Sequence, residues 1–418
     1  MREEDWKQKI QSFLQERNYD IRKKRNARWI DQKCAFDVVS FLAECILVYA
    51  TDDLVSFTRS DIWHSQYAID GIMYDFKKTD AETMTENEYD KFFGNSIAML
   101  HYAGILKGRH SSKRKGRPYI YHVNNREILE YISIRPKNAL VFLQLYIKKV
   151  LLDSDIYAPF EEFFKKQDYT SLSECREKFR QFLIKYTGIT KPTEPNKIFI
   201  KVINPLANAA DKKGYVNRGV SVGPITLSDL GYQRDNWYDE YLKKPKNVSR
   251  RDHMENMPDG GLSDELEHRS NRGKNKVRNY NRDYNNSHSE LRDQYYTDGS
   301  VEIHHIFPKH EPSYYVLVDK YENLVALTIS QHRDHAHPHA HMREIAKDYQ
   351  KLCIMQKIDT VRTDEEENGG TLYSFDDLKH VLAIGLDLDE ILDVADKDYD
   401  SLKRIVENYY KNLEEKRI

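Results

Sequence analysis

The apolar positions of the chain recur mostly at helical spacing, and capping signals mark where several helices begin. Residues 36–50, FDVVSFLAECILVYA, are apolar enough to form a buried helix. A second helix is predicted to begin after Thr58, an N-cap residue that has Asp61 three positions later. A third helix is predicted over 85–103, between a capping threonine and Gly104, a residue type that commonly ends helices. The pattern therefore indicates a largely helical fold.

Two short β-type runs, 105–106 and 119–123, follow the third helix and flank a polar, basic tip. Helices followed by such a hairpin resemble a winged-helix module, in which the helix over 85–103 would be the recognition helix. Clustered cations at the tip of a wing are suited to contact DNA phosphates. The predicted DNA-contacting residues of this wing are Lys107, Arg109, Lys113, Arg114, Lys115 and Arg117. The alternative is a winged-helix protein-interaction module whose hairpin is merely soluble.

The rest of the chain divides into helical and polar stretches. Apolar spacing predicts a helical scaffold over 131–245, with one strand-like run around 196–208. Residues 246–298 are rich in Asn, Arg, Lys and Gly, which predicts a linker or an arm that orders on binding. Their place just before a histidine cluster favours an arm that contacts phosphates. Its candidate DNA-binding residues are Arg272, Lys274, Lys276 and Arg278.

Composition and charge narrow the class of protein. The 418 residues allow two or three domains, and 39% of them are hydrophobic, enough to bury a core. The net charge of −2 hides local segregation of charge, so it does not argue against an anionic partner. No apolar run reaches the roughly 18 residues of a membrane helix, and the charged N-terminus lacks the apolar core of a secretion signal. The four cysteines form no C-x-x-C pair, which excludes a cysteine zinc ribbon and makes a reducing cytoplasm the expected location.

Histidines gather in one segment, since eight of the 16 lie between His304 and His341. The run VEIHHIFP predicts a short strand, and neighbours on a strand point to opposite faces. His304 and His305 therefore cannot both be ordinary core histidines. Asn323 follows 18 residues after His305, and His332 stands nine residues further on, at an expected helix start. The apolar run LVAL between them predicts a second strand.

These residue types suit the hydrolysis of a phosphodiester. A neutral imidazole, with a pKa near about 6.5, can accept a proton from water at neutral pH. A divalent cation held by histidines can bind a phosphate and neutralise the charge that grows on a leaving oxygen. Adjacent strand residues separate the two tasks in space. An Asn amide can then fix the backbone or a ring through hydrogen bonds.

The series His-His, Asn, His resembles the HNH nuclease motif, which is built on the ββα-metal fold and here covers roughly residues 301–341. The resemblance implies that His304 and His332 are metal ligands and that His305 is the catalytic general base. It gives Asn323 the role of orienting residue. The layout of the N-terminal half extends the resemblance to bacterial HNH-type type II restriction endonucleases.

That resemblance implies a sequence-specific endonuclease that acts on double-stranded DNA with one divalent metal ion per site. Mg²⁺ is the first expectation, and Mn²⁺ or another transition metal is the alternative. A homodimer or two successive nicks would be needed to cut both strands. The expected fold is α+β and mostly α-helical, and its predicted parts are a winged-helix-like region (1–130), a helical scaffold (131–245), a basic arm or linker (246–298) and a ββα-metal nuclease domain with C-terminal helices (299–418).

Two features depart from the family pattern. The histidine-rich branch of the family often has a third histidine four residues after the last one, but that position holds Ala336. His335 and His337 are nearby, and His335, which shares a helix face with His332, is kept as the further candidate ligand. The C-x-x-C pairs that hold a structural zinc in many HNH domains are absent, so flanking helices must support the small core. The main alternative is a non-catalytic winged-helix DNA-binding regulator whose histidines form a structural metal site.

Overall fold

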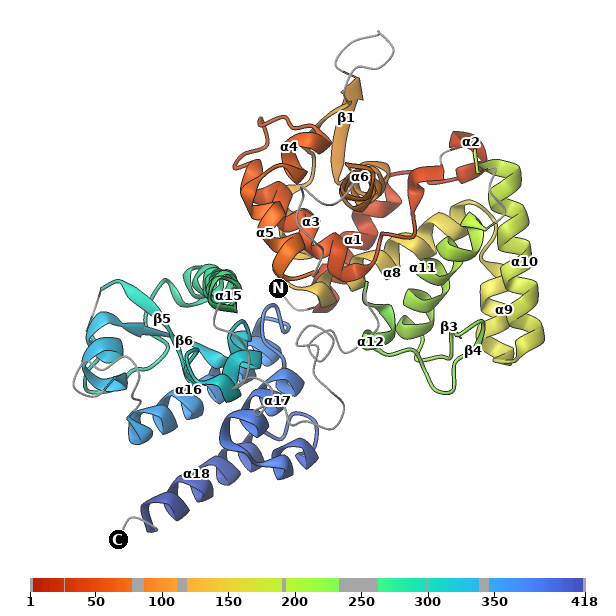
Figure 1. Ribbon diagram of the computed structural model, residues 1–418. Helices are drawn as coiled ribbons and strands as arrows, with labels where there is room; N and C mark the ends of the chain where they lie inside the picture. The colour runs from red at the N-terminus through yellow and green to blue at the C-terminus, as the bar shows by residue number, and fades with distance from the viewer. Residues whose placement is uncertain are drawn as a thin grey trace. The chain divides into compact units, whose positions relative to one another are not determined.

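The computed structural model describes residues 3–25, 27–76, 86–110, 119–189, 193–232, 262–297, 299–337 and 346–415. Within these residues, helices predominate and are joined by three two-stranded antiparallel sheets, so the expected α+β, mostly helical class is confirmed. The chain divides into two compact units, residues 6–237 and residues 238–418 with the first five residues (Figure 1). Among the described residues, no helix is both long and apolar enough to cross a membrane.

The first unit packs its helices around one core that is rich in aromatic side chains. The central helix α3 packs against α6, α7 and α8, and the buried Tyr146 donates its hydroxyl hydrogen to the carbonyl of Trp29 at 2.7 Å. The elements of this unit are α1 (Glu3–Gln15), α2 (Ile21–Lys24), η1 (Ala27–Trp29), α3 (Phe36–Tyr49), α4 (Arg59–Trp63), α5 (Gln66–Tyr74), α6 (Glu86–Ala103), β1 (Leu106–His110), β2 (Tyr119–Val123), α7 (Arg126–Ile134), α8 (Pro136–Asp153), α9 (Ala158–Lys166), α10 (Tyr169–Tyr186), α11 (Glu194–Ala209), β3 (Tyr215–Val216), β4 (Gly219–Val220) and α12 (Leu227–Leu230).

The helix boundaries predicted from local signals are confirmed where the residues are described. The helix expected over 36–50 is α3. At the start of α4, the Thr58 hydroxyl accepts from the Asp61 backbone N–H and the Asp61 carboxylate accepts from the Thr58 N–H, which completes a capping box. Helix α6 ends at Ala103, and Gly104 takes the left-handed φ of +85° that glycine tolerates best. The predicted cap at Thr85 lies outside the described residues.

The hairpin of β1 and β2 forms in the predicted place, and Phe57 adds an antiparallel bridge to Tyr121. Helix α6, the expected recognition helix, is enclosed over 92–103, where only Ala98 and His101 are not buried. This stretch cannot enter a DNA groove. Ahead of this stretch, the first side chain of α6 with a described exposure is Lys91, which is exposed.

The strand-like run around 196–208 is helical, so that prediction was wrong. The run lies in α11, whose buried side chains include Ile198, Val202 and Leu206, four residues apart. This spacing is helical, and tertiary packing favours it over the β propensity of the individual residues. The polar side chain of Asn204 is buried in α11 because it makes two hydrogen bonds to the backbone of Tyr215. Its Nδ2 donates to the Tyr215 carbonyl, and its Oδ1 accepts from the Tyr215 N–H.

The second unit surrounds a single β-hairpin with helices. Its elements are α15 (Leu262–Asn285), β5 (Val301–His305), η2 (Pro312–Leu317), η3 (Tyr321–Asn323), β6 (Leu324–Thr328), η4 (Gln331–Ala336), α16 (Lys347–Glu367), α17 (Phe375–Leu386), η6 (Asp389–Asp393) and α18 (Tyr399–Glu415). Strands β5 and β6 are those predicted on either side of Asn323, and they pair antiparallel with His304 opposite Val325 and His305 opposite Leu324.

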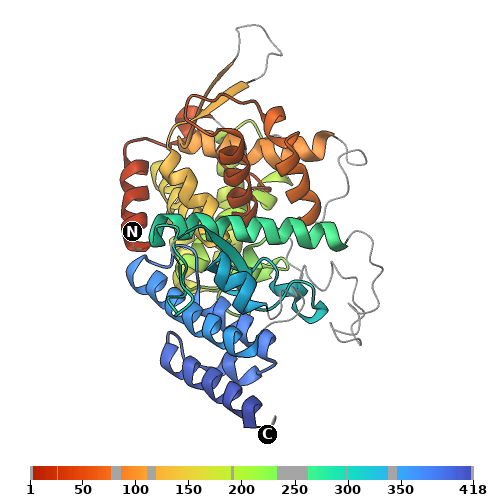
Figure 2. The ribbon, with the colours of Figure 1, turned by 90° about the vertical axis from the view of Figure 1, so that its left-hand side faces the viewer.

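The basic segment before the histidines is not simply a linker. Its described part contains α15, one unbroken helix of 24 residues (Figure 2). Helix α15 packs on the hairpin, where Gly273 lies so close to the Asp319 backbone that a Cβ would be 3.2 Å from it. Only a glycine allows this approach without a shift of the neighbouring chain. The boundary predicted at 298 therefore cuts through one packed unit.

Helix α16 is tied to the hairpin through a buried ion pair. The carboxylate of Glu290 accepts from the Lys357 ammonium at 2.6 Å and from the Ala326 backbone N–H of β6 at 2.9 Å. Lys357 is fully buried, and the ion pair with Glu290 offsets part of the cost of removing its side chain from water. Because the hairpin has no C-x-x-C pairs to hold a structural zinc, flanking helices are expected to support it. The contacts of α16 supply such support.

Candidate metal centre

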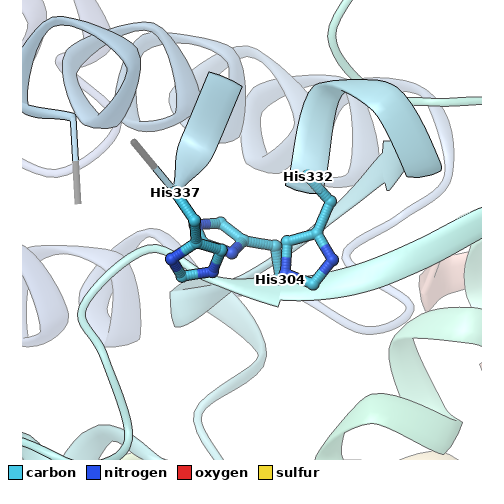
Figure 3. A group of neighbouring side chains, drawn as sticks. All are labelled: His304, His332 and His337. Carbon is cyan, nitrogen blue, oxygen red and sulfur yellow. The ribbon is translucent and has the colours of Figure 1, made fainter. Parts of the chain in front are cut away.

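Three histidines converge at one end of the hairpin. His304 comes from β5, His332 from η4, and His337 from the residue directly after η4 (Figure 3). One ring nitrogen from each lies within 4.8 Å of the others, and the ring centroids are 4.9 to 5.2 Å apart. His304 and His337 are buried and His332 is half-buried. Three imidazoles whose nitrogens lie this close together are a candidate metal-ligand set.

A carboxylate orients one of these rings. Nδ1 of His332 lies 2.6 Å from Oε2 of Glu302, and Arg333 donates to the other carboxylate oxygen at 2.5 Å. Arg333 foremost, and also His332, holds the pKa of Glu302 below its usual range, so the side chain is a carboxylate that only accepts. Nδ1 of His332 therefore carries the hydrogen, and its Nε2 is left with a lone pair for a metal.

Burial keeps His304 and His332 in the neutral form that metal ligands need. Burial, and then the neighbouring histidines His332 and His337, push the pKa of His304 well below its usual value. Burial also lowers the pKa of His332, against the opposing effect of Glu302. The lone pairs that a metal needs are thus present at neutral pH.

His305 has a different environment from its neighbour. Nε2 lies 3.0 Å from the carbonyl oxygen of Val318 and 3.4 Å from Oγ of Ser270. A carbonyl can only accept, so Nε2 carries the hydrogen and Nδ1 carries the lone pair. Burial foremost, and then the charge of Lys274, lowers the pKa of His305 to about 3. The ring is therefore an unprotonated base in a fixed tautomer.

Asn323 does not bond to His305 but holds the loop behind it. Its Oδ1 accepts from the Phe307 N–H at 2.8 Å, and its Nδ2 donates to the carbonyls of Phe307 at 3.1 Å and Leu317 at 3.0 Å. Leu317 precedes Val318, whose carbonyl fixes His305. The amide is fully buried. Its effect on the ring is therefore transmitted through the backbone of this loop.

The third histidine of the cluster is His337 and not His335. The ring of His335 stacks on Tyr295 at 3.5 Å and an interplanar angle of 16°, away from the cluster. Segment η4 is a π-type turn, wider than an α-helical turn, and the backbone at His337 is extended. Helical spacing therefore gave the wrong partner for His332. The many histidines in this segment indicate that a third one could join the cluster. The sequence does not reveal the π-type turn that selects His337.

Gln331 is a second residue that sequence reasoning missed. It is fully buried, and its Oε1 accepts from the Thr328 N–H at 2.9 Å and from the Ser289 hydroxyl at 2.6 Å. Its Nε2 donates to the Leu291 carbonyl at 3.0 Å and to Asp293 at 2.7 Å. These bonds fix η4 and hence His332, but nothing in the sequence marks this glutamine.

The predicted DNA-binding residues fall into three groups. Lys107 and Arg109 are exposed on β1, while Lys113, Arg114, Lys115 and Arg117 lie outside the described residues. On α15, Arg278 is exposed, whereas Arg272, Lys274 and Lys276 are half-buried. Lys274 is the one whose charge acts on His304, His305 and His332.

Comparison with known proteins supplies no relative, because no family model, no curated protein and no solved structure matches the chain.

Proposed function

We propose that the protein is a metal-dependent endonuclease of the HNH type that hydrolyses phosphodiester bonds in double-stranded DNA. The observation that carries the proposal is the pair His304 and His305 on β5. One ring joins a cluster of three histidines, and the other is a neutral base whose Nδ1 has no hydrogen-bond partner among the described residues. The hairpin β5–β6, with Asn323 between its strands, agrees with a ββα-metal fold.

The donor set fits a transition metal better than the Mg²⁺ expected from the sequence. His304, His332 and His337 offer three imidazole nitrogens, and within the described part of the chain no carboxylate joins the set. Mg²⁺ prefers oxygen ligands, whereas Zn²⁺, Mn²⁺, Co²⁺ and Ni²⁺ accept imidazole. When bound, such an ion would act as a Lewis acid toward a phosphate oxygen and its leaving group.

His305 supplies the base in this proposal. Nδ1 takes a proton from a water molecule as the water oxygen forms a bond to phosphorus. One P–O ester bond breaks, and the leaving oxygen takes a proton from solvent. The Val318 carbonyl stabilises the imidazolium formed in this step through the Nε2–H bond, and Asn323 keeps that carbonyl in place.

The first unit is proposed to place the nuclease on DNA. Helices α3, α4, α5 and α6 are followed by the hairpin β1–β2, and this order resembles that of a winged helix. The exposed Lys107 and Arg109 on β1 are suited to contact phosphates. Readout of bases by this unit makes a restriction-type endonuclease the proposed class. A homodimer or two successive nicks would cut both strands.

The test is incubation of supercoiled plasmid with the full-length protein, with each divalent metal in turn and with EDTA. We expect nicked and linear products with Mn²⁺, Co²⁺ or Ni²⁺ and less product with Mg²⁺. His305→Ala should abolish cleavage while DNA binding is retained, and His310→Ala, at an exposed histidine nearby, should cut as the wild type does. If no metal supports cleavage but DNA is bound, the protein is a non-catalytic DNA-binding regulator and the nuclease proposal is wrong.

A further inference from the structure

We propose that Lys274 is a catalytic residue, whose ammonium group contacts the scissile phosphate and stabilises the charge that grows on it during hydrolysis. This inference rests on the nuclease function proposed above. It separates Lys274 from the other cations of α15, which the sequence groups together as contacts to DNA. The reasons are its position on the helix, beside the base, and the absence of a hydrogen bond or ion pair to it within the described residues.

The position follows from how α15 packs on the hairpin. Ser270 lies against His305, with its Oγ 3.4 Å from Nε2 of the ring. Gly273 packs against the Asp319 backbone, which brings the helix axis close to the hairpin. Lys274 follows Ser270 by four residues and so projects from the same helix face, one turn further along.

The register of α15 is fixed by neighbouring contacts. Arg269, which is only 3% exposed, donates to the Asp319 carboxylate at 2.6 Å. Val277, one turn after Gly273, is fully buried. Rotation of the helix would break both contacts, so Lys274 is held toward the site by the packing of its neighbours.

Lys274 differs from the surrounding cations in its lack of a partner. Lys309 donates to Glu267 at 2.5 Å, and Arg333 donates to Glu302. Within the described residues, Lys274 makes no hydrogen bond or ion pair, although it is half-buried. Withdrawal of an ammonium from water without a counter-ion costs free energy, and a bound phosphate would supply the missing charge.

The place of Lys274 on α15 puts its charge on the side of the base. Ser270, one turn earlier on the same helix face, lies against the ring of His305. Burial foremost, and then Lys309, lowers the pKa of Lys274 itself. A phosphate bound beside His305 would therefore lie within the field of this ammonium.

A cation in this place acts more strongly on the transition state than on bound DNA. The phosphate oxygens gain negative charge as the water oxygen approaches phosphorus, so the attraction to a fixed ammonium increases during the step. A cation that only grips a phosphate lowers the dissociation constant and leaves the chemical step unchanged. Lys274 is therefore expected to affect the rate at saturation, whereas Arg278 on the exposed side of α15 is expected to affect binding.

The experiment compares Lys274→Met with Arg278→Met in the full-length protein under single-turnover conditions at saturating DNA. Lys274→Met should slow cleavage by about 100- to 1,000-fold, the effect typical of losing one transition-state donor. Its DNA dissociation constant should change less than about threefold. Arg278→Met should weaken binding and reduce the salt slope by about one phosphate contact.

Further measurements separate catalysis from structure. The thermal midpoint and the Zn²⁺ affinity of Lys274→Met should match those of the wild type, and methylammonium should restore part of the rate to Lys274→Ala. Wild-type cleavage by Lys274→Met, a loss confined to binding, or a loss of Zn²⁺ affinity would each overturn the catalytic role while leaving the nuclease proposal intact. A wild-type protein that cuts no DNA with any metal would overturn both.

Discussion

At the scale of single residues, Glu302 decides which nitrogen of His332 faces the cluster. Glu302→Ala removes the carboxylate that holds the Nδ1 hydrogen, so the ring can turn and change tautomer. Loss of such an orienting partner weakens metal binding by about 10- to 100-fold. We expect this loss in a Zn²⁺ titration by calorimetry, with partial recovery in Glu302→Gln, whose amide oxygen still accepts. Equal affinities in Glu302→Ala and the wild type would contradict the assigned role.

Glu322 gives the protein a specific dependence on pH. Burial foremost, and then the charge of Asp377, raises its pKa to about 8. A carboxyl group whose pKa is raised in the folded state favours folding when protonated, so this contribution is lost as pH rises from about 4.5 to about 8. Glu322→Gln stays neutral and keeps the acceptor for the Ser374 N–H.

The expected result is that the stabilities of the two proteins diverge as the pH rises. In urea unfolding, Glu322→Gln should match the wild type near pH 5 and be more stable near pH 9. Each 1 kcal/mol of that difference corresponds to about 2–4 °C in the thermal midpoint for a unit of this size. Glu407→Gln, at an exposed glutamate of α18, is the control and should not change the pH dependence. Parallel pH profiles for Glu322→Gln and the wild type would exclude a raised pKa.

At the scale of elements, the loop between β5 and β6 depends on one amide. Asn323→Ala removes three buried hydrogen bonds, each with a net value of about 1 kcal/mol. We expect the free energy of unfolding to fall by about 3 kcal/mol and cleavage to slow, because the Val318 carbonyl no longer holds His305. Zn²⁺ affinity should persist, since the three ligands lie outside this loop. A variant with normal stability but no metal binding would contradict this account.

Local signals explain what could be predicted at this scale. Strands β5 and β6, the cap at Thr58 and the end of α6 follow from patterns of a few residues, which the sequence displays directly. The ligand His337 could not be predicted, because it depends on a π-type turn. The role of Glu302 could not be predicted either, since it requires knowing that β5 lies beside η4.

Packing over longer distances explains the remaining differences. The segment 246–298 has the composition of a linker, yet its described helix α15 finds an apolar partner in the hairpin and a counter-charge at Asp319. The run in α11 has β propensity, but its buried face repeats every four residues. Both outcomes depend on partners distant in sequence, which a local pattern does not reveal.

At the scale of the whole molecule, the division into two units predicts that DNA binding and DNA cleavage can be altered by separate substitutions. The first unit presents Lys107 and Arg109, both exposed on β1, whereas the histidine cluster belongs to the second unit. Each phosphate contact contributes about −0.9 to the slope of log affinity against log salt. The double variant Lys107→Gln/Arg109→Gln should therefore show a salt slope that is shallower by the equivalent of about two phosphate contacts. Its cleavage rate at saturating DNA should be that of the wild type.

The matched control for this last prediction removes the same charge elsewhere on the first unit. Lys165 of α9 and Lys178 of α10 are exposed, and Lys165→Gln with Lys178→Gln changes the net charge by the same amount. If the wing contacts phosphates, the control keeps the wild-type salt slope, because a general change in charge does not remove a specific contact. Equal slopes in both double variants would mean that DNA senses only the overall charge of the unit. The phosphate contacts would then have to come from α15, and Arg278→Met should reduce the salt slope of DNA binding.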